Sequence, residues 1–246
     1  MTLRDEMEYL GGWLFRYRSY LPLAVVALFL PAMQGFHYPF GSHMLDEFWD
    51  FTCLTVSFLG LGIRAHVVGH KPAGTSGRNT KDQVAAALNT TGLYSVVRHP
   101  LYLGNFLMWL GVALFPRVWW FSLLITLAFS LYYERIMLAE EAHLRARFGV
   151  QFEEWARRTP AVIPSFRLWR APDLPFSFRT LLRREQSTFL AIIVVFGALE
   201  ISGDFLVSGR FQVDPIWGVI LAASAIVYLV VRVLKKWTRL LHVKGR

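Results

Sequence analysis

A short stretch of the chain, from Leu93 to Asn105, brings an arginine, a histidine and two tyrosines close together in sequence. A pair of adjacent carboxylates, Glu140 and Glu141, follows later in the chain. Both groups border long apolar segments, where ionisable side chains are costly and usually serve a function. Because the set combines cations, anions and aromatic rings, it could hold a zwitterionic ligand.

Each of these residues also has a simpler explanation. Arg98 could extend to lipid phosphates, as a lone arginine at the end of a membrane span often does. His99 could cap the local backbone, Pro100 could start a helix, and Tyr102 could belong to an interfacial aromatic belt. The pair Glu140-Glu141 could be the solvated face of a helix. The functional interpretation therefore depends on whether the fold brings these residues to one place.

The composition indicates a membrane protein. Of the 246 residues, 54% are hydrophobic and 17% are charged, and the mean hydropathy is +0.38. A soluble domain of this length would have fewer apolar residues and more charge. The net charge of +9 is not arranged as a basic helical face with exposed aromatic residues, so we expect no nucleic-acid partner. Basic residues between apolar runs instead suit anionic lipid headgroups.

The single cysteine, Cys53, lies inside an apolar segment. A lone cysteine excludes an intrachain disulfide and a cysteine-based zinc site. We therefore interpret Cys53 as a small packed apolar residue, and we expect no bound metal.

The apolar segments predict an all-α protein, a polytopic transmembrane helical bundle with about six spans. A helix needs about 20 residues, with a range of roughly 17–25, to cross a bilayer. The first segment contains two prolines and is short, as is the third, whereas the other four reach this length. We expect residues 1–246 to form a single membrane domain. The six segments are Leu21–Phe36, Phe48–Val68, Leu101–Phe115, Val118–Met137, Thr188–Val207 and Val213–Val233.

The basic residues predict the orientation of this bundle. If the six segments cross alternately, 24 of the 26 Lys and Arg residues lie on one side of the membrane. Basic residues accumulate on the cytoplasmic side of membrane proteins. The sequence therefore predicts that both termini are cytoplasmic.

The third and fourth segments are separated only by Pro116-Arg117, which predicts a tight antiparallel hairpin. Its two open ends return to the same membrane face, since each lies about 20 residues from the tip and a helix rises 1.5 Å per residue. The hairpin should therefore bring Arg98 and His99 close to Glu140. Gly104 and Gly111, seven residues apart, give small surfaces that permit close helix packing. Beyond the hairpin, Leu138–Arg158 alternates apolar and charged residues at helical spacing, which predicts a cytoplasmic amphipathic helix, or two helices broken at Gly149.

Two motifs resemble those of the isoprenylcysteine carboxyl methyltransferase family and its phospholipid methyltransferase relatives. The resemblance covers roughly residues 54–166 and implies an integral-membrane methyltransferase that uses S-adenosylmethionine. The matching residues, in order, are Arg98-His99-Pro100-x-Tyr102-x-Gly104, then Glu140-Glu141-x-x-Leu144-x-x-x-Phe148-Gly149, and then Trp155 and Pro164.

The resemblance also implies roles for individual residues. The His-Pro segment and the paired glutamates line the cofactor pocket in this family, which opens to the cytoplasm. The chemistry of an anionic acceptor, which an arginine would orient, separately favours Arg98 or a loop arginine such as Arg78 in catalysis, and Asn105 is the other expected catalytic residue. The expected cofactor-binding residues are Tyr94, His99, Pro100, Tyr102, Leu103, Gly104, Glu140 and Glu141. The sequence departs from the family at Phe152 and Trp155, where tyrosines are frequent, and in an additional C-terminal hairpin over residues 188–234.

The methyl acceptor is predicted only by class. A site between membrane spans suits a lipid or a lipidated molecule. An anionic carboxylate or phosphate oxygen needs no general base, so catalysis would rest on alignment and exclusion of water. The loop Thr75–Asn79 and the surplus of arginine favour a phosphate, as in a bacterial inner-membrane enzyme that acts on lipid phosphate. A phospholipid amine is an alternative, and it would have to lose a proton first.

A protein without enzymatic activity is the competing class. In a small transporter or membrane scaffold, Glu200 and Asp204 could be relay residues, because acidic groups inside membrane spans usually mark function. However, both lie towards the opposite membrane face from the Arg-His-Pro motif, and the spans show no inverted repeat.

Overall fold

The structure is a computed structural model, and it describes residues 2–17, 28–29, 31–72, 74–75, 86–211 and 213–246. Within these ranges the chain is helical and forms no β-strand. Four helices are long and apolar enough to cross a membrane, and a fifth apolar helix between them has 15 residues. The four are α3 (His43–His70), α5 (Trp119–Phe148), α7 (Phe178–Ser208) and α8 (Pro215–Trp237), and the shorter one is α4 (Pro100–Leu114).

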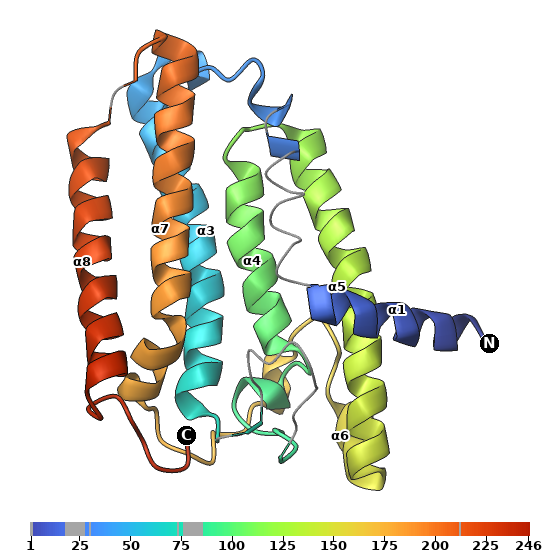
Figure 1. Ribbon diagram of the computed structural model, residues 1–246. Coiled ribbons are helices and arrows are strands. Elements are labelled where there is room, and N and C mark those ends of the chain that lie inside the picture. Colours follow the sequence, from blue (N-terminus) through green and yellow to red (C-terminus); the bar gives the residue numbers. More distant parts are fainter. Residues whose placement is uncertain (1, 18–27, 30, 73, 76–85, 212) are drawn as a thin grey trace.

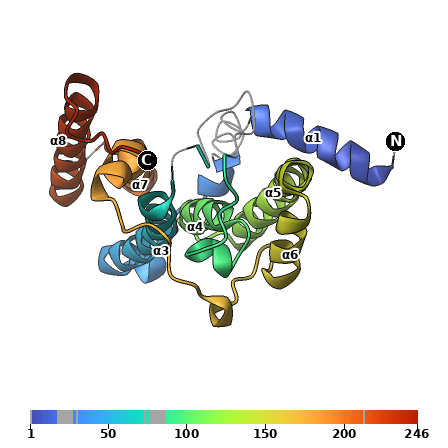
Figure 2. The same cartoon turned by 90° about the horizontal axis from the view of Figure 1, so that it is seen from below.

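These five helices correspond to the second to sixth predicted segments and run alternately up and down (Figure 1). Half of the first predicted segment, Leu21–Phe36, lies outside the described residues, which include 28–29 and 31–36. Seen along the bundle, α3 and α4 occupy the middle, with α5 on one side and α7 and α8 on the other (Figure 2).

The two ends of the bundle differ in chemistry, so we name them. The end where α3 finishes at His70 and α4 begins at Pro100 is the motif end (Figure 1). The end where α3 begins at His43 and α7 finishes at Ser208 is the distal end. The C-terminus lies at the motif end.

Small residues allow α3 and α4 to pack closely. A Cβ atom on Gly104 would lie 2.8 Å from the Gly60 carbonyl oxygen, and one on Gly111 would lie 2.4 Å from the Cys53 carbonyl oxygen. The Ser57 hydroxyl also donates a 2.9 Å hydrogen bond to the Met108 carbonyl across this interface. The close packing predicted from the spacing of Gly104 and Gly111 is therefore confirmed.

The apolar core joins α3, α4 and α7 in the distal half of the bundle. Cys53 is fully buried there with Phe115 and Phe196, and Trp217 of α8 belongs to the same cluster. Its complete burial in this cluster confirms the interpretation of Cys53 as a packed apolar residue.

The predicted hairpin between α4 and α5 is confirmed. Arg117 turns the chain with a φ of 59°, a conformation that is unusual for a residue other than glycine. Its guanidinium pairs with Asp46 and donates to the His37 carbonyl, so contacts with α3 and the segment before it hold the turn.

The predicted break at Gly149 is also present. Helix α5 continues well beyond its apolar part and ends at Phe148, where Gly149 takes a φ of 51°. Helix α6 (Val150–Arg158) follows, with Phe152 buried while Glu154 and Arg157 are exposed.

A helix near the N-terminus was not expected from the sequence. Helix α1 (Leu3–Tyr17) crosses α5 in its lower half (Figure 1). A Cβ on Gly11 would overlap the Arg135 carbonyl, and the Tyr132 hydroxyl donates a 3.0 Å hydrogen bond to the Leu14 carbonyl. The apolar residues of α1 are mixed with acidic ones, so the sequence has no long apolar run there that would predict a helix.

Candidate functional site

The residues before α4 are held by a proline-rich segment, residues 159–177, that crosses the motif end. The backbone N–H of Arg98 donates to the Pro160 carbonyl, and that of Ser165 donates to the Val96 carbonyl. Gly92 donates to the Arg170 carbonyl in the same way, at 2.9 Å. With its backbone fixed, this stretch carries Arg98 and His99 to the start of α4, where Pro100 occupies the first turn.

The hairpin brings the motif and the glutamates together, as predicted. Nη1 of Arg98 lies 2.9 Å from the Glu141 carboxylate. The His99 ring bridges both carboxylates, with Nε2 3.0 Å from Glu141 and Nδ1 3.6 Å from Glu140. We call Arg98, His99, Glu140 and Glu141 the ionic cluster.

The glutamates favour the protonated form of the His99 ring. Burial alone favours the neutral ring, but hydrogen bonds and charges from Glu140 and Glu141 outweigh it and raise the pKa of His99 above its usual value. The ionic cluster therefore combines Arg98 and a histidine whose charged form is favoured with two carboxylates.

The ionic cluster retains capacity for a ligand. Nε of Arg98 is buried, and no residue that the structure describes accepts a hydrogen bond from it. A buried donor without an acceptor is destabilising, so an anionic ligand group would be favoured there. The Glu140 side chain is 33% exposed, compared with 16% for Glu141, so it is the more accessible carboxylate.

Aromatic rings extend from the ionic cluster into the bundle. Tyr102 stacks on His99 with centroids 5.6 Å apart, and its other neighbour is Tyr133 of α5, at 4.7 Å. The faces of such rings attract cations, including those without N–H donors. The rings of Tyr102 and Tyr133 therefore lie between the ionic cluster and the apolar interior of the hairpin.

Asn105 belongs to a different set of contacts. Its amide oxygen accepts a 2.7 Å hydrogen bond from Arg64, and its amide nitrogen donates to the Tyr133 hydroxyl at 3.1 Å. Arg64 also forms a two-bond ion pair with Glu185 of α7, at 3.1 and 2.7 Å. This polar network joins α3, α4, α5 and α7.

Arg64 and Glu185 were missed as site residues in the sequence. Their side chains are only 16% and 6% exposed, and each is an ionisable group at the border of an apolar segment. Their position at the border of an apolar segment could have identified them, because ionisable residues rarely occur at such borders without a partner or a function.

The remaining predicted residues occupy different places at the start of α4. Pro100 is buried in the first turn, Leu103 is partly buried, and Gly104 lies against Arg64 and Gly60 of α3. Cofactor contact for these three residues stays a prediction, whereas the role of Gly104 in helix packing is clear from the geometry.

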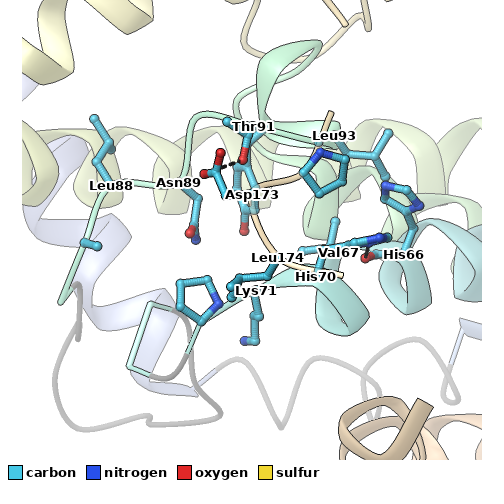
Figure 3. Close-up of a pocket in the computed structure, with 15 residues that line it drawn as sticks. His66, Val67, His70, Lys71, Leu88, Asn89, Thr91, Leu93, Asp173 and Leu174 are labelled. Atoms are coloured by element: carbon cyan, nitrogen blue, oxygen red, sulfur yellow. Dashed lines mark hydrogen bonds between the residues drawn. The ribbon is translucent and has the colours of Figure 1, made fainter. Parts of the chain in front are cut away.

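A pocket of about 250 Å³ lies beside this region, between the end of α3 and the proline-rich segment (Figure 3). Tyr94 lines it, four residues before Arg98, and it is the predicted site residue that the pocket includes. Thr91 and Asp173 form one wall through a 3.0 Å hydrogen bond. The other lining residues are His66, Val67, His70, Lys71, Pro72, Ala87, Leu88, Asn89, Gly92, Leu93, Pro172 and Leu174.

Lys71 gives this pocket an ionisable ammonium group. The residue is only 6% exposed, and burial, reinforced by the charge of Arg184, lowers the pKa of its ammonium to about 7. His66 also lines the pocket, and no described residue forms a hydrogen bond with the buried Nε2 of His66. Both groups were missed in the sequence, where nothing indicated that residues 87–89, 91–94 and 172–174 line a pocket with them.

Comparison with known proteins identifies the family. The profile of the phospholipid methyltransferase family matches residues 52–151. The chain is 30% identical over 202 residues to the nickel-cobalt-cadmium resistance protein NccN of Alcaligenes xylosoxydans xylosoxydans, covering 78% of this chain and 87% of that protein. It is 32% identical to the cobalt-zinc-cadmium resistance protein CzcN of Cupriavidus metallidurans, over 65% of this chain and 70% of the other.

A named methyltransferase is also similar. The protein-S-isoprenylcysteine O-methyltransferase of Schizosaccharomyces pombe is 34% identical over 77 residues, which is 31% of this chain and 33% of that enzyme. No solved structure matches. The family profile spans the hairpin with both of its motifs, and the chain therefore belongs to the phospholipid methyltransferase family of membrane proteins.

Proposed function

We propose that this protein transfers a methyl group from S-adenosylmethionine to an oxygen of a lipid or lipidated molecule. The observation that carries the proposal is the ionic cluster, in which the hairpin holds an arginine, a histidine and two glutamates together at the motif end. Family membership supports the reaction type. The names of the two metal-resistance relatives do not specify a methyl acceptor, so the acceptor is proposed from the site.

The residues of the site fit the cofactor. S-adenosylmethionine supplies the methyl group on a sulfonium, and it also carries an ammonium and a carboxylate. Glu140 would bind the ammonium, and the buried Nε of Arg98 would bind the carboxylate or orient an anionic acceptor. The Tyr102 face would stabilise positive charge. The His99 ring, fixed by both glutamates, would keep their carboxylates in place.

The pocket beside Tyr94 supports an anionic acceptor. Lys71 in its protonated form gives it a cation, and Val67 and Leu174 give it apolar walls. An anionic oxygen held there needs only alignment with the methyl group and exclusion of water. The site therefore requires no general base for this acceptor.

An amine acceptor is the second candidate, and Lys71 is the observation that favours it. An amine nucleophile must lose a proton, and a buried lysine with a pKa of about 7 is suited to accept one. The same residue would then act as a base instead of a cation.

Cofactor binding tests the first part of the proposal. We expect Glu140→Ala and His99→Ala to abolish S-adenosylmethionine binding, measured by calorimetry on folded protein in detergent. Glu154→Gln is the matched control, because Glu154 is an exposed carboxylate on α6 near the same end. If both cluster variants bind as tightly as the parent, the cofactor pocket lies elsewhere.

The role of Arg98 is tested with Arg98→Lys. Lysine retains the charge but lacks the planar fork that aligns an oxygen, and a small misalignment can reduce the rate about 100-fold. If Arg98 orients the acceptor, this variant binds cofactor normally and loses single-turnover methylation. A raised dissociation constant with near-normal turnover would instead assign Arg98 to the cofactor carboxylate, and no change in either would remove it from the site.

A further inference from the structure

A second group of ionisable residues lies at the distal end, away from the ionic cluster. It joins the start of α3, through His43, Asp46 and Asp50, to the end of α7, through Glu200 and Asp204 (Figure 1). Asp46, Asp50 and Glu200 are 1%, 2% and 3% exposed. Three buried carboxylates at one place are strongly unfavourable unless cations or hydrogen-bond donors compensate for them.

The donor atoms of this group converge. One carboxylate oxygen each from Asp46, Asp50 and Glu200 lie within 4.8 Å of one another. A second set, made by His43, Glu200 and Asp204, meets the same limit. Glu200 belongs to both sets, so a single cation bound to Glu200 could be coordinated by residues of either set.

The described residues leave this charge incompletely compensated. Arg117 pairs with Asp46, and the Tyr38 hydroxyl donates a 2.8 Å hydrogen bond to Asp204. Both oxygens of Asp50 are buried, and no described residue donates a hydrogen bond to either of them. The carboxylate of Asp50 therefore faces that of Glu200 inside the group, without a cation or an N–H donor to compensate for its burial.

We propose that this group is a binding site for a divalent transition-metal cation of the Zn²⁺ or Co²⁺ class. Asp50 and Glu200 are its central ligands, with His43 at the aqueous rim. Mg²⁺ retains several waters and Ca²⁺ takes six to eight oxygens, which a dry set of three carboxylates does not provide. Four-coordinate metals that accept both carboxylate and imidazole fit better.

The proposal adds a function to residues that the methyl-transfer site does not use. The competing explanation is a proton shared between Asp50 and Glu200, which would leave no net demand for a metal. The two explanations differ in whether the purified protein takes up a cation, and this can be measured without cofactor or acceptor.

The experiment uses the full chain in detergent, stripped with a chelator and titrated with Co²⁺ and Zn²⁺. We expect one metal ion per chain, retained through gel filtration, with visible Co²⁺ absorption typical of low coordination number. Asp50→Asn and Glu200→Gln, which preserve side-chain shape, should each weaken binding by at least about 100-fold, since loss of even an outer-shell partner costs about 10- to 100-fold.

Matched controls separate this site from other carboxylates. Glu154→Gln removes an exposed carboxylate on α6 outside both ligand sets, and Glu140→Ala removes one from the ionic cluster, so neither should change metal uptake. The proposal is overturned if the parent protein retains no metal, or if Asp50→Asn and Glu200→Gln bind as tightly as the parent. It is also overturned if Glu140→Ala abolishes uptake, because the metal would then be at the other end.

Discussion

At the scale of single residues, Lys71 distinguishes the two acceptor classes. Its ammonium lies in the pocket and has a pKa of about 7, because burial and the charge of Arg184 disfavour the protonated form. Below pH 7 it is mostly a cation, and above pH 7 it is mostly a neutral amine. An anionic acceptor needs the first form, and a reaction that requires a base needs the second.

We expect a prenylated cysteine carboxylate, used as an anionic probe, to bind about tenfold more weakly at pH 8 than at pH 6, as the protonated fraction of Lys71 falls. Lys71→Arg, which stays charged, should bind equally at both pH values. Calorimetry measures both. If methyl transfer instead rises from pH 6 to pH 8 and Lys71→Arg loses that rise, Lys71 acts as a base and the acceptor is an amine.

The sequence predicted some site residues better than others. Arg98, His99, Glu140 and Glu141 could be placed together because a two-residue hairpin tip forces both ends to one face. The partners of Arg64 and Asp50 come from α7, more than 100 residues later, and no local pattern sets that pairing. Contacts between distant helices depend on packing, which a single sequence does not show.

At the scale of helices, the contact between α3 and α4 holds the site together. The Arg64 network crosses it, and the two helices approach at Gly60, Gly104 and Gly111. The glycine spacing predicted this approach. Helix α1 was missed because acidic residues interrupt its apolar positions, and a surface helix of this kind is hard to distinguish from a loop.

We expect Gly111→Ala to destabilise the protein by about 1–3 kcal/mol, because its Cβ would overlap the Cys53 carbonyl and the Ser57 hydroxyl. Gly62→Ala is the control on α3, where the Cβ would meet nothing within 4 Å. Alanine favours helix over glycine, so that variant should gain up to about 1 kcal/mol. Unfolding by denaturant in detergent compares them, and equal behaviour would refute close packing at Gly111.

At the scale of the whole molecule, the C-terminal hairpin packs against the helices that carry the motifs. The family profile ends at residue 151, yet α7 supplies Glu185 to the Arg64 network and packs against α3. The apolar segments predicted this hairpin but not its contacts. Five predicted spans correspond to helices, because long apolar runs in a membrane protein leave few alternatives to a helix.

The orientation of the bundle remains a prediction from the charge distribution. We expect a reporter fused after Arg246 to be active only in its cytoplasmic form, since 24 of 26 Lys and Arg residues would then face inside. A reporter inserted after Arg210, in the connection between α7 and α8 at the distal end, should give the opposite signal. An extracytoplasmic signal from the C-terminal fusion would contradict this topology.

The Arg64–Glu185 pair has a consequence for biosynthesis. The two residues are 121 positions apart, so at about 5–20 residues per second the ribosome makes the arginine roughly 6–24 s before its carboxylate. Asn105 is synthesised 41 residues after Arg64 and accepts one hydrogen bond from it, but it carries no opposite charge. We expect nascent α3 to keep its arginine at the membrane surface until α7 emerges, so the last helices to be synthesised complete the insertion of the first part of the core.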